Sequence, residues 1–211
     1  IRGDLQNYSF TYGGYNVWRD TGILVVSNND TVDGSEVSDF TQVDELTTYG
    51  GPVEIYTDRA QNGTRYVTDI IVIRPETGTL TIRDYAETSS HGAYELYSVG
   101  GKTGRIYTTV VDAKTDVNDV VLHGSVASSD LVTYYVDMQD NLHIAPTTEI
   151  SGVLSAVGKS NTDLLTINDE SYYKSVAAGA NAFEPSKSEQ TFALDEYGYV
   201  VKTVTGATSS R

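Results

Sequence analysis

The chain is divided into short runs of β-branched, aliphatic and aromatic residues, and this division limits it to folds built from strands. Four such runs are present, at residues 22–26, 70–73, 79–83 and 105–111. Each is bounded by Gly, Pro, Asn, Asp or Ser, residue types that favour turns over continued strands. Helical periodicity fits only residues 38–46 and 171–180, and residues 177–181 fit a loop equally well. The sequence therefore predicts an all-β fold with antiparallel hairpins and little helix.

Two segments share one hairpin pattern: an alternating strand, an Asp, two variable residues, a turn residue and a returning strand. They span residues 132–143, with Asp137 and Asp140 at the turn, and residues 190–201, with Asp195 and Gly198. Asp can accept hydrogen bonds from the backbone of its own turn, and Gly, Asp or Asn tolerates positive φ. We predict that both segments are antiparallel hairpins with the first Asp at the same place.

A looser third copy covers residues 52–73, with Asp58 before a longer turn. Similar segments at intervals of this size indicate small β units that follow one another along the chain. We therefore predict three units of the β-barrel or β-sandwich type, at residues 15–77, 78–148 and 149–206.

These hairpins and the strands before them resemble a known family. Residues 195–201, preceded by the strand segments 150–157 and 163–173, are similar to the β-rich repeat region of large surface proteins of Gram-positive bacteria. Those proteins also carry S-layer homology domains. Residues 53–58 and 67–73 are similar to the same hairpin in that family. The resemblance implies a secreted, wall-associated protein with a structural or adhesive role, and it transfers no catalytic residues.

Charge and composition exclude several classes of protein. The 211 residues include 29 Asp and Glu against 14 Lys and Arg, for a formal net charge of −15. This charge disfavours binding to nucleic acid or to an anionic membrane surface. The chain has no Cys, which excludes disulfides, thiolate metal sites and a Cys nucleophile.

No apolar run approaches the roughly 20 residues that span a bilayer, so direct membrane insertion is not expected. No signal peptide is visible at the start of the chain. We expect a fragment of a longer extracellular precursor, located at the cell wall or cell surface.

No catalytic motif stands out. The chain lacks Gly-x-Ser-x-Gly, His-Glu-x-x-His and phosphate-binding glycine motifs, and no spacing singles out a pair of glycosidase carboxylates. The three histidines, His91, His123 and His143, form no i, i+4 pair. We expect His143 to be an ordinary, partly exposed strand residue and expect no zinc site. The sequence thus predicts that the chain is not an enzyme.

Two acidic loops are candidate calcium sites, because hard cations accept irregular cages of oxygen ligands. The loop at residues 28–36 is not an EF-hand, since Phe40 occupies the place of the bidentate Glu. Solvated turn acids are the alternative for both loops. The candidate ligands are Asn28, Asp30, Asp33 and Glu36 in the first loop and Asp112, Asp116 and Asp119 in the second. Apart from calcium, no cofactor is expected.

Tyrosine is unusually abundant, with 16 residues against 4 Phe and 1 Trp. Aromatic rings stack on sugars and are enriched at protein interfaces, but tyrosine also packs across strands. Tyr12, Tyr15 and Trp18 are therefore candidates for glycan binding or for an interface between chains.

Together these features predict a non-enzymatic structural segment of a secreted, S-layer-like cell-surface protein. It would act as a spacer or as a self-associating building block. The alternative is a carbohydrate-binding or adhesive β module. The expected partners are other copies of the chain, neighbouring domains of the same surface protein, and glycans.

Overall fold

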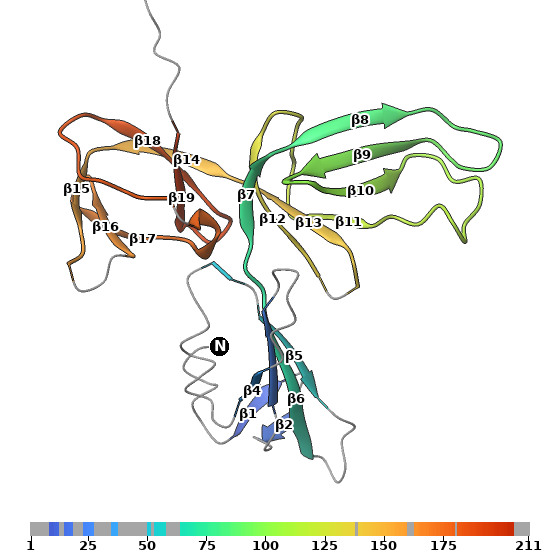
Figure 1. Ribbon diagram of the computed structural model, residues 1–211, viewed down its shortest axis with the longest axis horizontal. Coiled ribbons are helices and arrows are strands. Elements are labelled where there is room, and N and C mark those ends of the chain that lie inside the picture. The colour runs from blue at the N-terminus through green and yellow to red at the C-terminus, as the bar shows by residue number, and fades with distance from the viewer. Residues whose placement is uncertain are drawn as a thin grey trace, which may run out of the picture. The chain divides into compact units, whose positions relative to one another are not determined.

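The chain folds into two units, residues 1–74 and residues 75–211, each described here by itself (Figure 1). The computed structural model describes residues 9–12, 15–18, 23–27, 35–37, 50–51, 53–57, 64–137, 139–159, 163–179 and 181–204. Within these ranges, the side chains of the strands and loops are described from residue 73 onward. Within these ranges the structure is all-β and contains no α-helix, as the sequence predicts. None of the described helices is long and apolar enough to cross a membrane.

The first unit contains a six-stranded sheet around its longest strand, β6. Its strands are β1 (Ser9–Tyr12), β2 (Tyr15–Trp18), β3 (Ile23–Ser27), β4 (Ser35–Val37), β5 (Val53–Thr57) and β6 (Thr64–Val72). Strands β5 and β6 pair in antiparallel fashion, which confirms the predicted hairpin in this segment. Strands β2 and β3 both pair in parallel with β6. Asp58 and the helix candidate at residues 38–46 lie outside the described residues.

The second unit begins with two sheets that face each other. Its first strands are β7 (Glu76–Thr79), β8 (Thr81–Tyr85), β9 (Tyr94–Val99), β10 (Lys102–Tyr107), β11 (Val120–Leu122), β12 (Leu131–Val136) and β13 (Leu142–Pro146). Strands β8, β9 and β10 form a meander, seen side by side in Figure 1. The other sheet has the order β11-β13-β12-β7, with β11 parallel to β13.

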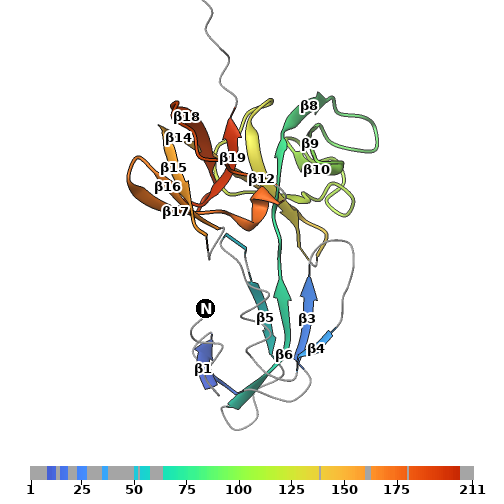
Figure 2. The ribbon, with the colours of Figure 1, turned by 60° about the vertical axis from the view of Figure 1, so that its left-hand side comes forward.

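The remaining strands repeat this arrangement. They are β14 (Thr148–Gly152), β15 (Leu154–Val157), β16 (Leu164–Ile167), β17 (Glu170–Tyr173), β18 (Gln190–Leu194) and β19 (Val200–Val204). Strands β15, β16 and β17 form the meander, and β14, β18 and β19 form the second sheet (Figure 2). A parallel bridge from Lys174 to Val200 takes the place of β11. We call residues 76–146 the first repeat and residues 148–204 the second repeat.

The predicted helix candidate at residues 171–180 is instead strand β17 followed by the short 3-10 helix η1 (Val176–Ala178). Ser175 caps η1, because its hydroxyl accepts a hydrogen bond from the Ala177 N–H. The unit boundaries at 15–77, 78–148 and 149–206 stay a prediction.

The two predicted hairpins have the same turn. In β12–β13 the Asp137 N–H donates to the Asn141 carbonyl, and in β18–β19 the Asp195 N–H donates to the Tyr199 carbonyl. In each case one carboxylate oxygen accepts the backbone N–H groups two and four residues later, at 2.8–3.0 Å. The third residue after each Asp has positive φ, 62° at Asp140 and 84° at Gly198. The equivalent placement of the two aspartates is therefore confirmed.

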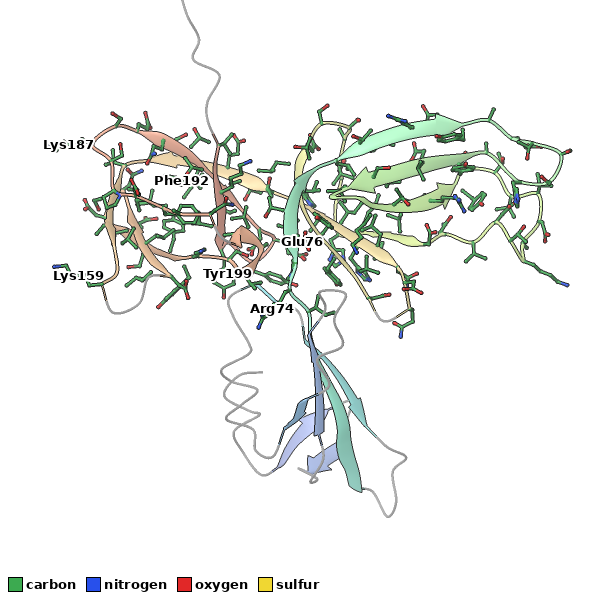
Figure 3. The ribbon with its side chains drawn as sticks, viewed as in Figure 1. Arg74, Glu76, Lys159, Lys187, Phe192 and Tyr199 are labelled. Carbon is green, nitrogen blue, oxygen red and sulfur yellow. The ribbon has the colours of Figure 1, made fainter. Side chains whose placement is uncertain are left out.

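Each repeat is a small sandwich with its own apolar core. In the first repeat, Tyr97 and Val99 of the meander pack with Val132, Leu142 and Ile144 of the other sheet. In the second, Leu165 and Ile167 pack with Phe192 and Val200, and Phe192 is labelled in Figure 3. Alternate residues of each strand point inward, so the apolar positions of the sequence meet between the sheets.

The two repeats contact each other through small side chains. Ala177, Ala193 and Val201 of the second repeat form a buried cluster against which Leu131 of the first repeat packs. The Thr77 hydroxyl donates to the Ala177 carbonyl at 2.7 Å, and this bond joins β7 to η1. Small residues allow the backbones of the two repeats to approach closely.

The turn between β9 and β10 requires a glycine at position 100, where the Tyr134 side chain packs directly against the backbone. Gly100 and Gly101 both have positive φ, 55° and 80°. A Cβ added at Gly100 would overlap the hydroxyl of Tyr134, which donates to Glu76 Oε2 at 2.7 Å. A Cβ added at Gly101 would have nothing within 4 Å.

We predict that Gly100→Ala destabilises the protein more than Gly101→Ala. Both variants strain the backbone, at about 1–2 kcal/mol, but only Gly100→Ala also displaces the Tyr134 side chain. Such overpacking adds about 1–3 kcal/mol. Urea unfolding of the two variants measures the difference, and equal losses would contradict the close packing of Gly100 on Tyr134.

Candidate functional site

The first predicted calcium loop is largely outside the described structure. Asn28, Asp30 and Asp33 are not among the described residues. Glu36 is described by its backbone alone, on β4, where it pairs with Leu24 of β3. Calcium binding by this loop stays a prediction.

In the second loop, the three predicted ligands each hold a different part of the backbone. Asp112 Oδ1 accepts the Lys114 N–H at 3.0 Å in a local turn. Asp119 Oδ1 accepts the N–H of Arg105, which joins the loop to strand β10. Both carboxylates therefore act as local hydrogen-bond acceptors for the loop.

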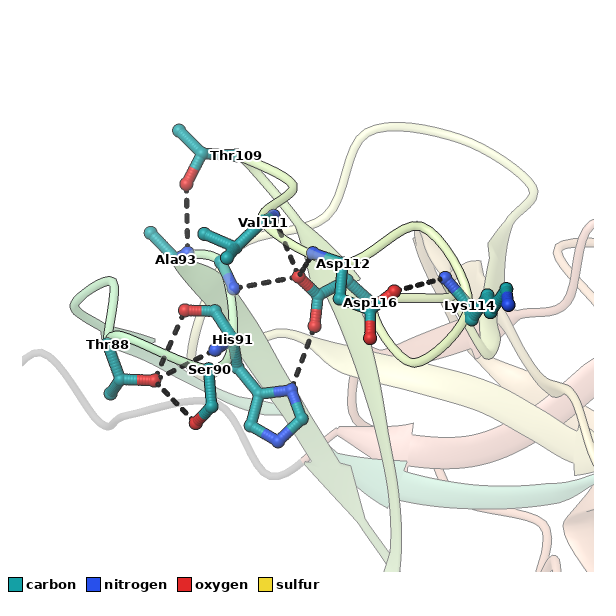
Figure 4. A network of polar contacts seen from close by, with 10 residues as sticks. Thr88, Ser90, His91, Ala93, Thr109, Val111, Asp112, Lys114 and Asp116 are labelled. Atoms are coloured by element: carbon teal, nitrogen blue, oxygen red, sulfur yellow. Dashed lines mark hydrogen bonds and ion pairs between the residues drawn. The ribbon is translucent and has the colours of Figure 1, made fainter.

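Asp116 is the buried centre of this loop (Figure 4). Its Oδ2 accepts the backbone N–H groups of Gly92, Val111 and Asp112, each at 2.9 Å, and its Oδ1 lies 2.9 Å from His91 Nδ1. Burial acts to raise the pKa of Asp116, but these hydrogen bonds outweigh it and hold the pKa well below its usual range. The carboxylate closes the loop against the segment before β9.

Among the side chains that the structure describes, no three of His, Asp and Glu lie close enough together to hold a metal ion. Calcium binding at Asp112, Asp116 and Asp119 thus remains a prediction, and Asp116 already has four hydrogen-bond contacts in the loop.

The predicted aromatic cluster lies on strands β1 and β2 of the first unit. These strands are antiparallel, with Tyr12 opposite Tyr15 and Trp18 opposite Ser9. Their side chains are outside the described part of the structure. A role for Tyr12, Tyr15 and Trp18 in ligand binding stays a prediction.

A row of tyrosines that no sequence pattern singles out crosses the outer face of the β8–β9–β10 meander. Tyr85 and Tyr107 both pair with Tyr94 in the register. The Tyr85 and Tyr94 rings stack with centroids 4.9 Å apart and planes 10° apart. The Tyr107 ring lies 5.4 Å from Tyr94 at 54°. Tyr85 remains 40% exposed, so part of this row faces solvent.

The next row on the same face is basic. Arg83 and Arg105 both pair with Leu96, and side chains two residues apart on a strand share a face. Arg105 also places its guanidinium carbon 5.5 Å from the centre of the Tyr94 ring. We call the residues of these two rows the Tyr–Arg face: Tyr85, Tyr94, Tyr107, Arg83, Leu96 and Arg105.

The third row on this face consists of hydroxyl residues, since Thr81 and Thr103 both pair with Ser98. None of the nine positions in the three rows is acidic, although the chain as a whole carries a net charge of −15. The face therefore combines exposed aromatic surface with two cations and no anion.

Two histidines and two carboxylates form a continuous chain of contacts beside the β12–β13 hairpin. His123 Nε2 lies 2.9 Å from His143 Nδ1. The outer nitrogen of each ring contacts a carboxylate: His123 Nδ1 lies 3.2 Å from Glu196 Oε2, and His143 Nε2 lies 3.0 Å from Asp137 Oδ2. We call His123 and His143 the histidine pair.

The sheet topology creates this pair from residues that are distant in sequence. The parallel register of β11 and β13 sets Val121 beside His143, and His123 follows two residues later on the same face. The His123 N–H donates to the Ile144 carbonyl at 2.9 Å, which continues the pairing past the end of β11. Tyr135 of β12 stacks on the His143 ring, with centroids 4.4 Å apart and planes 10° apart.

Glu196 reaches the histidine pair from the second repeat, where it follows Asp195 in the β18–β19 turn. The side chains of His123 and Glu196 are 24% and 27% exposed, and those of His143 and Asp137 are 15% and 9% exposed. The pair thus lies at a partly open junction between the two repeats. No i, i+4 spacing marks it, so the sequence alone predicts only an ordinary strand residue at His143.

No protein-family model, curated protein or solved structure matches the chain.

The two equivalent turn aspartates have opposite pKa shifts. Burial raises the pKa of Asp195 by more than the hydrogen bonds from Ser175 and the turn backbone lower it. Burial also acts to raise the pKa of Asp137, but hydrogen bonds from Asn141, His143 and the backbone outweigh it and lower the pKa. The difference comes first from burial, which is deeper at Asp195 than at Asp137, and then from the second carboxylate oxygen, which meets a single hydroxyl in Asp195.

These shifts predict different effects of removing each charge. The lowered pKa of Asp137 means that its contribution to stability is present above its unfolded pKa of about 3.9 and is lost as the pH falls through the folded value. The raised pKa of Asp195 means the reverse: its contribution is present below about 3.9 and is lost as the pH rises through the folded value. At neutral pH we expect Asp137→Asn to lower the free energy of unfolding by about 1–3 kcal/mol, and Asp195→Asn by less.

Urea unfolding at neutral and acidic pH measures both effects. The two variants are matched controls, because each leaves one side-chain oxygen to accept the two turn N–H groups. An Asp195→Asn variant that loses as much stability at neutral pH as Asp137→Asn would contradict the opposite pKa shifts of the two aspartates.

Proposed function

We propose that the chain is a non-enzymatic structural segment of a secreted, S-layer-like cell-surface protein, acting as a spacer and a self-associating building block. The observation that carries this proposal is the repetition of one strand arrangement in residues 76–146 and 148–204. Because each repeat has its own core, a protein built from such repeats can grow in length one unit at a time. The resemblance of the hairpin sequences to bacterial surface proteins supports the same role.

The join between the repeats suits a spacer. Strand β13 ends at Pro146 and β14 begins at Thr148, so a single residue connects them. The hydroxyl of that residue, Thr147, donates to the Leu131 carbonyl at 2.8 Å. A one-residue connection tied to the preceding repeat leaves little of the freedom that a long flexible linker has.

Self-association is supported by an exposed apolar segment at residues 110–122. Five of its six large apolar side chains are between 37% and 60% exposed, and they are Val110, Val111, Val117, Val121 and Leu122; the sixth, Val120, is buried. The segment ends in β11, which is an edge strand of its sheet. Edge strands have unpaired backbone groups that can pair with another chain. The net charge of −15 opposes such contacts until salt or divalent cations screen it.

We therefore predict association that strengthens as salt or divalent cations are added, measured by sedimentation velocity on the whole chain. Val121→Lys should weaken it, because the substitution places a charge on β11. Ser188→Lys adds the same charge on an exposed loop of the second repeat and serves as the matched control. A chain that stays monomeric under every condition would rule out self-association.

A second candidate function, carbohydrate binding or adhesion, is favoured by the Tyr–Arg face. The Tyr85 ring, stacked on Tyr94 and 40% exposed, offers its exposed surface to a sugar ring, and three hydroxyl residues lie on the same face. Arg83 and Arg105 would favour sugars that carry carboxylates, through charge-assisted hydrogen bonds. The ligand class that this face fits is an acidic polysaccharide.

We predict that polygalacturonate binds more tightly than a neutral polysaccharide in isothermal titration calorimetry. Tyr85→Ala should weaken binding roughly tenfold, which corresponds to about 1.4 kcal/mol of lost stacking. Arg105→Gln should reduce the preference for the acidic polymer. Tyr197→Ala is the control, because Tyr197 is 53% exposed but belongs to a turn of the second repeat.

Binding that Tyr197→Ala weakens as much as Tyr85→Ala would contradict the assignment to the meander face. The same assay on Ala variants of Tyr12, Tyr15 and Trp18 tests the predicted cluster of the first unit.

A further inference from the structure

We propose that the histidine pair is a binding site for one divalent transition-metal ion of the Zn²⁺ class. His123 Nε2 and His143 Nδ1 face each other at 2.9 Å. Two nitrogen ligands of one tetrahedral Zn²⁺, at about 2.0–2.1 Å from the metal, lie about 3.3 Å apart. The two ring nitrogens are therefore within a few tenths of an ångström of the spacing that a shared metal ion requires.

The histidine pair has one N–H group fewer than its polar contacts require. Two neutral imidazoles carry two N–H groups, one on each ring. The rings nevertheless make three polar contacts, to Glu196, to each other and to Asp137. One of the three contacts has no proton unless one ring becomes an imidazolium. A metal ion between the rings removes the shortage, because each ring then uses its single N–H on its own carboxylate.

The carboxylates are placed as they are around metal-binding histidines. A histidine that ligates a metal with one nitrogen commonly donates its other N–H to a carboxylate or carbonyl, which sets the tautomer and the ring orientation. Here Glu196 contacts the outer nitrogen of His123, and Asp137 contacts that of His143. Both inward nitrogens are thereby left to carry lone pairs toward the same point.

Asp137 is itself held in place by the hairpin turn. Its Oδ1 accepts the N–H groups of Gln139 and Asn141, and its Oδ2 accepts Asn141 Nδ2 at 2.9 Å. Tyr135 stacks on the face of the His143 ring, with centroids 4.4 Å apart. His143 is thus a fixed ligand, and the more exposed His123 is the ring that turns to admit the ion.

Charge and access are also suitable. Two neutral imidazoles, the carboxylates of Asp137 and Glu196 and a divalent ion sum to zero charge. The side chains of His123 and His143 remain 24% and 15% exposed, so water can supply the remaining ligands. Soft or borderline ions such as Zn²⁺, Ni²⁺ and Cu²⁺ prefer imidazole, whereas Ca²⁺ and Mg²⁺ prefer oxygen ligands. The site would therefore be distinct from the predicted calcium loops.

The test is titration of the whole chain, without a polyhistidine tag, with Zn²⁺ by isothermal calorimetry. We expect one ion per chain at the histidine pair, and we expect His123→Gln and His143→Gln each to weaken that binding by tenfold or more. His91→Gln is the matched control, because His91 also contacts a carboxylate but has no second histidine beside it. Thermal unfolding should show a Zn²⁺-dependent rise in melting temperature that both variants of the pair lose.

Two further measurements separate this site from others. Glu196→Gln should weaken Zn²⁺ binding about tenfold, the usual effect of losing an orienting carboxylate, while Ca²⁺ should not compete. Cu²⁺ bound at the pair should show nitrogen ligands in its electron paramagnetic resonance spectrum. Absence of Zn²⁺ binding, or binding that persists unchanged in the His123→Gln, His143→Gln double variant, would overturn the proposal. Failure of self-association would leave it intact, because the two measurements concern different residues.

Discussion

The aspartate carboxylate at the hairpin turn is the interaction on which both repeats depend. In each hairpin one oxygen of Asp137 or Asp195 accepts two backbone N–H groups of the turn. This bond pattern defines where the first strand ends and the second begins, and so it determines the register of the pair. The register in turn decides which residues, such as Ile144 and Phe192, enter the core.

The two turns differ in the contacts of the second carboxylate oxygen of their aspartate. In the second repeat, Asp195 Oδ2 accepts the Ser175 hydroxyl at 2.6 Å, and Ser175 in turn caps η1. This contact lies in the interior and serves packing. In the first repeat, Asp137 Oδ2 faces His143 at the partly open junction. The turn aspartate therefore contacts the histidine pair only in the first repeat, whereas the turn of the second repeat contributes the neighbouring Glu196.

How well each feature could be predicted depended on the distance in sequence over which its contacts act. The hairpins were predictable because the Asp, the turn residue and both strands lie within about a dozen neighbouring positions, and local turn chemistry acts over that range. The Tyr–Arg face was not found, because Tyr85, Tyr94 and Tyr107 align only through the register of three strands. The histidine pair was missed for the same reason, since it needs the parallel pairing of β11 with β13 and a carboxylate from the other repeat.

The sequence by itself determined the fold class, the two matching hairpins and the acidic character of the chain. These follow from residue type and local spacing, because strand-forming residues, turn residues and charges act on their near neighbours. Only the tertiary structure decided that Asp116 closes a loop and that His123 meets His143. It alone also decided that arginines gather beside tyrosines on one face of a meander. Each of these depends on which strands become neighbours, and strand pairing is decided by the burial of the whole apolar surface rather than by any local motif.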